Sequence, residues 1–246
     1  MYWIVFFLLV FLIIGLAYAV AKGKLEPKYV PVLNVVFMLL AVFFGYKIYD
    51  SITAPVKFNK IKKQRYAKVI DRLKDIRDSE IAMRTITGDY TGSFDSLIKF
   101  VDTARFPIVQ QRDSVIKKFD KFRNIDIEEE IIVFDTLGYV PVKDSLFKGS
   151  DRYKEMMWVP IPGREKQVKF ELKKGYIHKD KVKLPVFMAR VAKREILYDQ
   201  PEDLVKQEEN VISTEEVNGP YIMVGSLDEV TTSGNWPKVY DIKDKQ

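Results

Sequence analysis

Two long apolar runs open the chain, and each has the length of a membrane-spanning helix. Tyr2–Ala21 and Tyr29–Tyr46 contain no charged residue, and Asn34 is the only strongly polar side chain in the second run. A helix of about 20 apolar residues crosses a hydrocarbon core roughly 30 Å thick. A short turn around Gly23 separates the two runs. The pattern therefore predicts a two-helix transmembrane hairpin over residues 1–50, with both of its ends on the same side of the membrane.

The first run also has one feature of a cleaved secretion signal, because it ends in the small-residue pattern Ala17-Tyr18-Ala19. A signal peptide carries a basic segment before its apolar core, and that core spans about 7–15 residues. No basic residue precedes this run, and the run is longer than such a core. We therefore expect an uncleaved transmembrane helix.

A helical period follows the second apolar run. Ser51–Pro55 interrupts the pattern, since Thr53 can cap a helix and proline fits a first helical turn. A separate long helix is therefore expected from Val56 to Thr87, with Gly88 directly after its end. Apolar residues recur at helical spacing along this helix, and we expect them to form its packing interface. These residues are Tyr66, Val69, Leu73, Ile76 and Met83.

The rest of the chain changes from a helical pattern to a strand pattern. A short helix is expected over Phe94–Asp102 with Ser93 as its cap, and another over Asp113–Arg123. Glycine and proline then separate short apolar runs that are typical of strands. The acidic segment Asp199–Asn218 is expected to be a loop with at most one helical turn. The expected strands are Ile131–Phe134, Met156–Val159, Val168–Leu172, Leu184–Val191 and Tyr221–Val224.

Together these elements predict a membrane-anchored α+β protein with an antiparallel β-sheet. The domain organisation has three parts. Residues 1–50 form the transmembrane hairpin, residues 51–105 form a juxtamembrane part with the long and the short helix, and residues 106–246 form a β-rich extramembrane domain.

Positive charge is concentrated just after the second apolar run. Lys57–Thr87 holds ten Lys and Arg residues against four Asp and Glu, while the whole chain has a net charge of +6. One interpretation is a solvated helix surface, and the other is contact with anionic lipid headgroups. Nucleic-acid binding is not favoured, because the segment has few interleaved aromatic residues and adjoins the bilayer. The predicted membrane-surface patch is Lys57, Lys60, Lys62, Lys63, Arg65 and Lys68.

The sequence offers little catalytic chemistry. There is no cysteine and only one histidine, His178, which excludes disulfides, thiolate metal sites and His-rich metal sites. The acidic run Asn124–Glu130 has oxygen ligands for a hard cation, but it lacks the glycine and final glutamate spacing of an EF-hand, so a solvated strand edge is favoured. No nucleotide-binding or hydrolase motif is present. We expect no catalytic residue, metal or cofactor, although a carboxylate pair brought together by folding stays open.

One region resembles a known family. Residues 67–82 (AKVIDRLKDIRDSEIA), then Thr87-Gly-Asp-Tyr90 and Phe94-Asp-Ser-Leu97, resemble the end of the long helix in type IV pilins and type II pseudopilins. The layout is also similar to a group of uncharacterised bacterial envelope proteins, through Gly225-Ser226-Leu227 and Gly234-Asn235-Trp236. The resemblance implies a membrane anchor, a helix packed on a β-sheet, and an extracytoplasmic domain.

Two signals disagree about orientation. Lys22, Lys24 and Lys28 lie in the turn, and six basic residues follow the second run, so the positive-inside rule places the large domain in the cytoplasm. The pilin-like layout places it in the periplasm, and we favour that layout. The leading hypothesis is a structural or scaffold subunit of a bacterial inner-membrane assembly. Its expected partners are the lipid bilayer and other envelope proteins or further copies of the chain. The alternatives are a cytoplasm-facing accessory subunit and, third, a membrane-bound enzyme.

Overall fold

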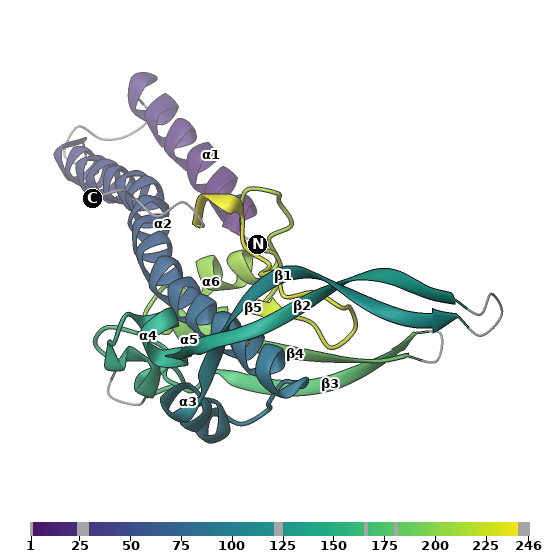
Figure 1. Cartoon of the computed structure of the whole chain (residues 1–246). Coiled ribbons are helices and arrows are strands. Elements are labelled where there is room, and N and C mark those ends of the chain that lie inside the picture. Colours follow the sequence, from purple (N-terminus) through teal and green to yellow (C-terminus); the bar gives the residue numbers. More distant parts are fainter. Residues whose placement is uncertain (1, 24–29, 121–124, 165–166, 180–181, 241–246) are drawn as a thin grey trace. The chain divides into compact units, whose positions relative to one another are not determined.

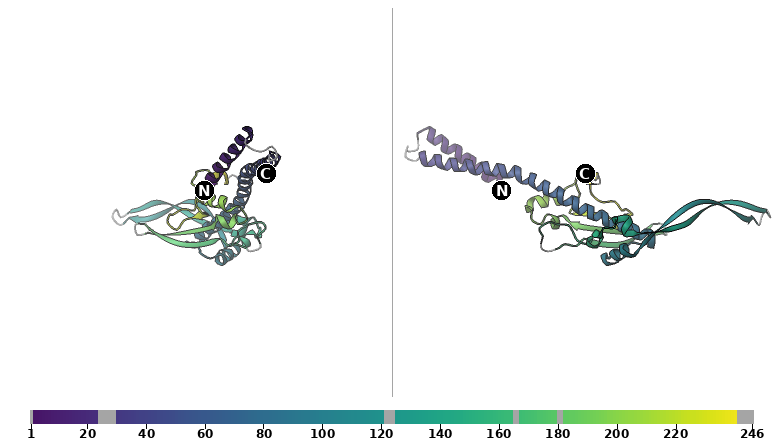
Figure 2. Two further views of the ribbon diagram at one scale, coloured as in Figure 1. Left: turned by 180° about the vertical axis from the view of Figure 1, so that it is seen from behind. Right: turned by 60° about the vertical axis from the view of Figure 1, so that its left-hand side comes forward.

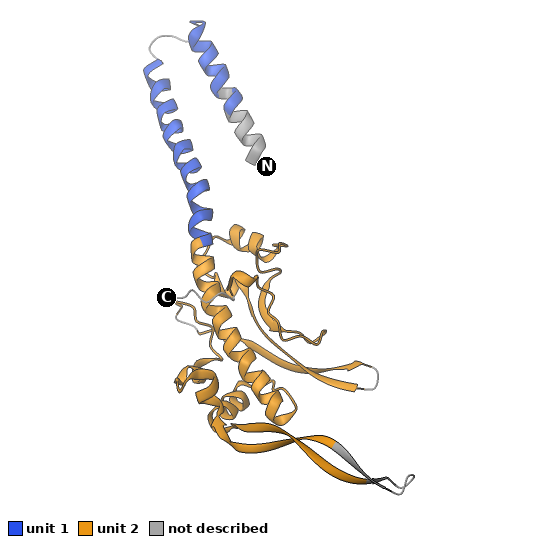
Figure 3. Cartoon of the chain, turned by 45° about the horizontal axis from the view of Figure 1, so that its top comes forward, with its two compact units in different colours: residues 1–59 blue, residues 60–246 orange. Residues whose placement is uncertain are grey.

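The computed structural model describes residues 2–23, 30–120, 125–164, 167–179 and 182–240; at 2–9, 12, 119–120 and 125–129 it describes the backbone alone. The chain forms two compact units, residues 1–59 and residues 60–246 (Figure 3). The boundary falls inside the predicted juxtamembrane part, so residues 60–87 of the expected long helix belong with the β-rich residues.

The first unit contains helix α1, Tyr2–Ala21, and the first half of helix α2, Val30–Thr87. Among the described residues, α2 is the one helix that is long and apolar enough to cross a membrane. The structure thus shows a long apolar N-terminal helix rather than the expected pair of spans. Many apolar side chains in the first half of α2 are exposed, Met38 and Leu39 among them, as they are on a helix surrounded by lipid.

The predicted break at Ser51–Pro55 is wrong, because α2 continues through Pro55 without interruption. A proline inside a helix removes one backbone hydrogen bond and costs about 3 kcal/mol. Helix formation is cooperative, so the regular turns on either side hold the chain in the helical path. Thr53 and Pro55 therefore carry the signals of a helix start, but no new helix begins there.

A three-stranded antiparallel sheet lies in the second unit, in the order β3-β4-β5 (Figure 1). Its strands are β3 (Glu171–Lys179), β4 (Val182–Ala192) and β5 (Tyr221–Gly225). The expected strands at 184–191 and 221–224 are confirmed within β4 and β5, and the one at 168–172 overlaps the start of β3. The α+β class with antiparallel sheets is therefore confirmed.

The expected strand Met156–Val159 is wrong. A 3-10 helix, η2, occupies Asp151–Glu155, and the N–H of Met156 donates to the carbonyl of Tyr153 at 3.2 Å. The backbone is thus used for a local turn. Beyond the turn, Trp158 makes only an isolated bridge to Lys169.

Short helices complete the second unit. The expected helix after Ser93 is confirmed as α3, although the Ser93 side chain makes no capping hydrogen bond. One eight-residue helix, α6, lies inside the acidic segment that was expected to be mostly loop. The helices are α3 (Phe94–Thr103), α4 (Val142–Phe147), α5 (Lys193–Ile196), α6 (Glu202–Glu209) and the 3-10 helix η3 (Lys238–Tyr240).

The core of the second unit combines one face of α2 with side chains from α3, β4 and β5. Of the five residues expected on the packing face, Met83 is half-buried. Tyr90, just beyond α2, packs against Phe187 of β4 with ring centroids 4.8 Å apart and ring planes tilted by 50°. The other four residues of the face are fully buried: Tyr66, Val69, Leu73 and Ile76.

A separate two-stranded hairpin is made by β1, Arg105–Asp120, and β2, Ile125–Pro141. The helix expected at Asp113–Arg123 is therefore wrong over 113–120, and residues 121–123 lie outside the described residues. Two adjacent β-branched residues, Val115 and Ile116, stand opposite Glu130 and Glu129 of the partner strand. Such residues suit a pleated ribbon, and pairing with β2 decides against the helix. The run Ile131–Phe134 is confirmed as part of β2.

Candidate functional site: a β-hairpin arm

Strands β1 and β2 form an arm that extends away from the rest of the second unit (Figures 2 and 3). Their register runs from Arg105 opposite Pro141 to Asp120 opposite Ile125. At about 3.3 Å per residue, this ribbon is roughly 50 Å long. Among the described strands, β1 and β2 pair only with each other. Each strand therefore keeps one edge without a strand partner in the described part of the chain.

The root of the arm is held firmly. The N–H of Val142, which follows β2, donates to the carbonyl of Ala104, which precedes β1, at 3.0 Å. Val142 is completely buried, as is Val101 of α3. Tyr153 of η2 donates its hydroxyl proton to Asp102 Oδ1 at 2.7 Å. The arm thus leaves a packed base, and its direction at the root is fixed by that base.

One face of the arm carries exposed apolar residues between polar ones. Alternate residues of β1 share a face, and each shares it with the residue opposite on β2. Val109, Gln111 and Asp113 stand opposite Thr136, Phe134 and Ile132 on this face, and their neighbours continue it. Its large apolar residues are 50% to 64% exposed, so none of them is in a core. This arm stripe consists of Val109, Val115, Ile132, Phe134 and Tyr139.

The arm also contains a bulge. Ile108 stands opposite Gly138 and Val109 stands opposite Thr136, so Leu137 has no partner across the ribbon. A bulge increases the local twist of a strand pair. The side chain of Leu137 is 65% exposed and adds to the apolar surface near the root.

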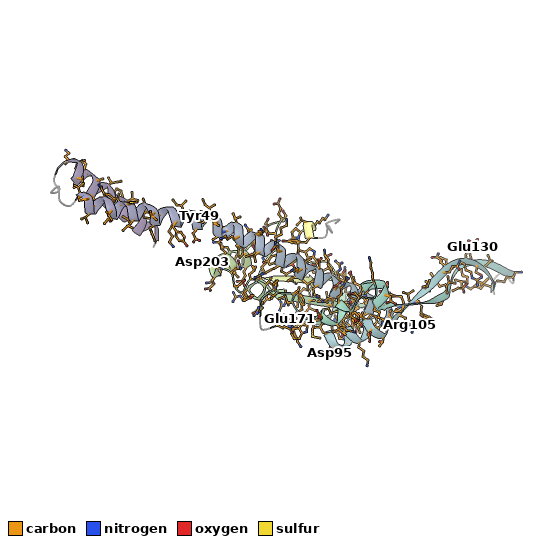
Figure 4. All side chains as sticks on the ribbon, turned by 90° about the vertical axis from the view of Figure 1, so that its left-hand side faces the viewer. Tyr49, Asp95, Arg105, Glu130, Glu171 and Asp203 are labelled. Carbon is orange, nitrogen blue, oxygen red and sulfur yellow. The ribbon has the colours of Figure 1, made fainter. Side chains whose placement is uncertain are left out.

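The charges of the two strands differ in sign. By sequence, β1 has four basic and two acidic residues, whereas β2 has five acidic and no basic residues. Arg112 Nε lies 2.6 Å from Asp135 Oδ2 across the ribbon. Figure 4 shows Arg105 at the root and Glu130 far along the arm, with side chains standing free on both sides.

Such an arm is unusual for a surface that meets only water. A two-stranded hairpin is at best marginally stable in water, and free strand edges attract other strands. A row of exposed apolar residues marks a protein-interaction site more often than an ordinary surface. The arm is therefore the candidate functional site. The local sequence pattern does not reveal the arm, because it favours a helix over Asp113–Arg123. The run Ile131–Phe134 is the one signal that points to a strand.

The predicted membrane-surface patch is divided by the structure. Lys62 is 7% exposed, and its Nζ lies 2.9 Å from Glu208 Oε2 and 3.0 Å from Glu216 Oε2. Arg65 bonds Asp199 through both of its terminal nitrogens. These two cations are used inside the protein and do not belong to a lipid-facing surface. The other four residues are exposed: Lys57, Lys60, Lys63 and Lys68.

A buried charge cluster forms around Glu208 of α6. Besides Lys62, its carboxylate bonds Lys193 Nζ at 3.0 Å and the Tyr66 hydroxyl at 3.3 Å. Burial lowers the pKa of Lys193. Burial alone would also lower the pKa of Lys62, but hydrogen bonds to Glu208 and Glu216 outweigh it and raise that pKa. Lys193 is completely buried and its Nζ makes three hydrogen bonds, so the cluster ties α2, α5 and α6 together.

A groove along the outer face of α2 is the other hollow of interest. Its volume is about 1120 Å³, and aspartates and arginines from α2 line it together with Phe147 and Arg152. Arg152 pairs with Asp75 at 3.1 Å and its carbonyl accepts from Arg72 at 2.8 Å. Burial raises the pKa of Asp75, against the nearby arginines. Asp75 is thus held by Arg152, while Lys63 and Lys68 also line the groove.

The sequence favours no chemistry at His178 or at the acidic run Asn124–Glu130. His178 is exposed at the end of β3, opposite Lys183. Within the described residues, no three His, Cys, Asp or Glu side chains are grouped so that they could hold a metal ion. Of the acidic run Asn124–Glu130, only the Glu130 side chain is described, and it is exposed. A metal site at the rest of that run lies outside the described residues.

No protein-family model, no curated protein and no solved structure matches this chain. The pilin-like layout stays a prediction from the sequence.

Proposed function

We propose that this protein is a membrane-anchored structural subunit of a bacterial envelope assembly, and that it works by binding protein through the β1–β2 arm. The observation that carries the proposal is the arm stripe, five large apolar side chains at least half exposed on a ribbon with a fixed root. Burying such residues in a protein contact removes about 25 cal/mol of unfavourable hydration per Å² of apolar surface. The arm offers this gain only to a partner.

Membrane anchoring is the second part of the proposal. The apolar first half of α2 supports one span, and the uncharged sequence of α1 supports a second one, so residues 1–50 would form a transmembrane hairpin. The pilin-like order of anchor, helix and sheet favours a periplasmic position for the domain. An anchored subunit with a protruding arm fits a scaffold better than an enzyme, since Asp75 in the groove beside α2 is already paired with Arg152.

A cytoplasm-facing accessory subunit is the second candidate, and one observation favours it. Lys57, Lys60, Lys63 and Lys68 are exposed just after the apolar part of α2. Basic residues beside a span are retained on the cytoplasmic side, where they also meet anionic headgroups. In that orientation the arm would bind cytoplasmic protein.

The proposal is tested by photo-cross-linking of the full chain in its own membrane. A photoreactive amino acid is placed at Phe134 or Tyr139 of the arm stripe and, as a matched control, at the exposed Asp203 of α6. We expect discrete protein adducts from the arm positions and none from Asp203. Adducts from neither arm position, with the protein present at its normal level in the membrane, would contradict the proposed function.

A further inference from the structure

We propose that the arm binds the arm of a second copy of this chain, with strand β1 of one copy paired edge to edge with strand β2 of the next. This proposal rests on the proposed function, because it names the partner of the same site. It is carried by three properties of the described residues: the free strand edges, the register and the charge of the two strands.

The first property is the pair of free edges. In an antiparallel ladder, the N–H and C=O groups of successive residues point alternately to one side and to the other. Within the described strands β1 faces β2 on one side only, so every second residue between Arg105 and Lys118 directs its backbone groups outward. The same holds for β2. The arm therefore presents one β1 edge and one β2 edge to any incoming strand.

The second property is that the register inside the arm can be repeated between arms. Inside the hairpin, hydrogen-bonded residue pairs alternate with pairs that exchange no hydrogen bond. In the second kind of pair, the backbone N–H and C=O groups of both residues point outward, toward the free edges. A neighbouring β1 can therefore pair with β2 in the register already present. Asp113 of one copy then stands opposite Ile132 of the next, and Val115 stands opposite Glu130, as they do within one arm. The arm stripes of the two copies then lie on the same face of the joined sheet.

The third property is charge, and it decides between the ways in which two arms can meet. A contact of β1 with β1, or of β2 with β2, brings strands of the same sign together. A contact of β1 with β2 brings a strand with four basic and two acidic residues against one with five acidic residues. Opposite charges on facing strands stabilise a ladder and like charges destabilise it. The charges select the β1–β2 contact.

A β1–β2 contact between copies is heterologous, since the two surfaces that meet are different. Such a contact leaves a free β2 edge at one end and a free β1 edge at the other. Repetition therefore produces a closed ring or an open filament, and not a two-fold dimer.

The test uses the fact that the chain has no cysteine. Full-length protein is prepared in mild detergent in two populations with different tags, one carrying Asp113→Cys and the other Ile132→Cys. Each chain then holds a single thiol and cannot cross-link to itself. The populations are mixed and treated with a short bis-maleimide, since directly opposite residues have Cβ atoms about 4.5–5.5 Å apart. A mixture of Asp95→Cys and Asp203→Cys, both exposed outside the arm, is the control.

We expect a cross-linked dimer that carries both tags, and only traces when either population is treated alone. A second pair, Val115→Cys with Glu130→Cys, should behave alike, which guards against a fold defect in one variant. We also expect the yield to fall as salt is raised, because exposed charges are screened beyond about 8–10 Å.

The other outcomes overturn the proposal in distinguishable ways. Dimers within single populations, with no dimer in the mixture that carries both tags, would show a two-fold contact between like strands. Absence of any dimer, while photoreactive Phe134 variants still give adducts with other proteins, would leave the proposed function standing with a different partner. Absence of both kinds of adduct would remove the proposed function as well.

Discussion

One carboxyl oxygen of Glu80 accepts a hydrogen bond from the backbone N–H of Thr91 at 3.0 Å, across the turn that ends α2. The second oxygen, Oε1, is buried and has no hydrogen-bond partner among the described residues. Burial raises the pKa of Glu80 to about 8, against the lowering effect of the Thr91 N–H. Glu80 is therefore mostly protonated at neutral pH, and it fastens the turn through one oxygen only.

This relationship predicts a stability that falls with rising pH. The folded-state pKa lies above the ordinary value of 4.5, so the folded protein holds the proton more tightly than the unfolded chain. The stabilisation is complete below the ordinary value and is lost as pH rises toward about 8, by up to about 1.4 kcal/mol per pH unit. Urea unfolding between pH 5 and pH 9 measures it. Glu80→Gln keeps the acceptor for Thr91 and should flatten the slope.

A suitable control for Glu80→Gln is Glu130→Gln, because Glu130 is exposed on the arm. That change should leave the pH dependence as it is in the parent protein. An unaltered slope in Glu80→Gln would show that Glu80 is ionised in the folded protein at neutral pH.

Local periodicity predicted some elements well and failed where distant contacts decide. The buried face with Leu73 and Ile76 follows from helical spacing, because one side of α2 packs on the core over several turns. The arm does not follow from local pattern, since residues 113–120 become a strand only by pairing with β2. Thr53 and Pro55 carry the local signals of a helix start, but the cooperative helix α2 continues through them.

The candidate patch illustrates the same limit for charges. Lys62 and Lys63 are adjacent in sequence and identical in type, yet one is buried and the other exposed. The difference comes from Glu208 and Glu216, which lie about 150 positions away along the chain. No property of the segment Lys57–Lys68 alone marks Lys62 as a core cation.

This contrast gives a matched pair of substitutions. Lys62→Met leaves Glu208 with one charged partner fewer in a buried site, and we expect a loss of about 1–3 kcal/mol in the free energy of unfolding. Lys63→Met should change it by less than about 0.5 kcal/mol. Both are measured by chemical denaturation of the full chain in detergent. Equal effects of the two substitutions would mean that Lys62 is solvated like its neighbour.

The packing face of α2 can be tested at Leu73, which is completely buried. Leu73→Ala should lower the free energy of unfolding by about 2–5 kcal/mol, because it removes apolar contacts and leaves a cavity. Ile81, on the same helix but 38% exposed, provides the comparison. Ile81→Ala should cost clearly less, and a loss at Leu73 no greater than at Ile81 would contradict the burial.

The arm stripe predicts the opposite combination of effects. Phe134 is 62% exposed, so Phe134→Ser should change the free energy of unfolding by no more than about 0.5 kcal/mol. The same change should abolish protein adducts from a photoreactive residue at Tyr139, since it removes the phenyl ring at the centre of the arm stripe. Cross-linking and denaturation are measured on the same preparation. Normal adducts with Phe134→Ser would place the contact elsewhere on the arm.

Membrane topology separates the periplasmic from the cytoplasmic subunit. Single cysteines are introduced in the cysteine-free chain at Asp203 in α6, at Lys22 after α1, and in a short tag before Met1. A membrane-impermeant maleimide is then applied to intact spheroplasts and to lysed ones. With two spans and an outer domain, Asp203→Cys and the tag should react in intact spheroplasts, whereas Lys22→Cys should react only after lysis.

The reversed pattern would assign the domain to the cytoplasm and support the accessory subunit, as the exposed lysines after the span suggest. Opposite reactivity of the tag and Asp203→Cys would show a single span, because an odd number of crossings separates the two ends.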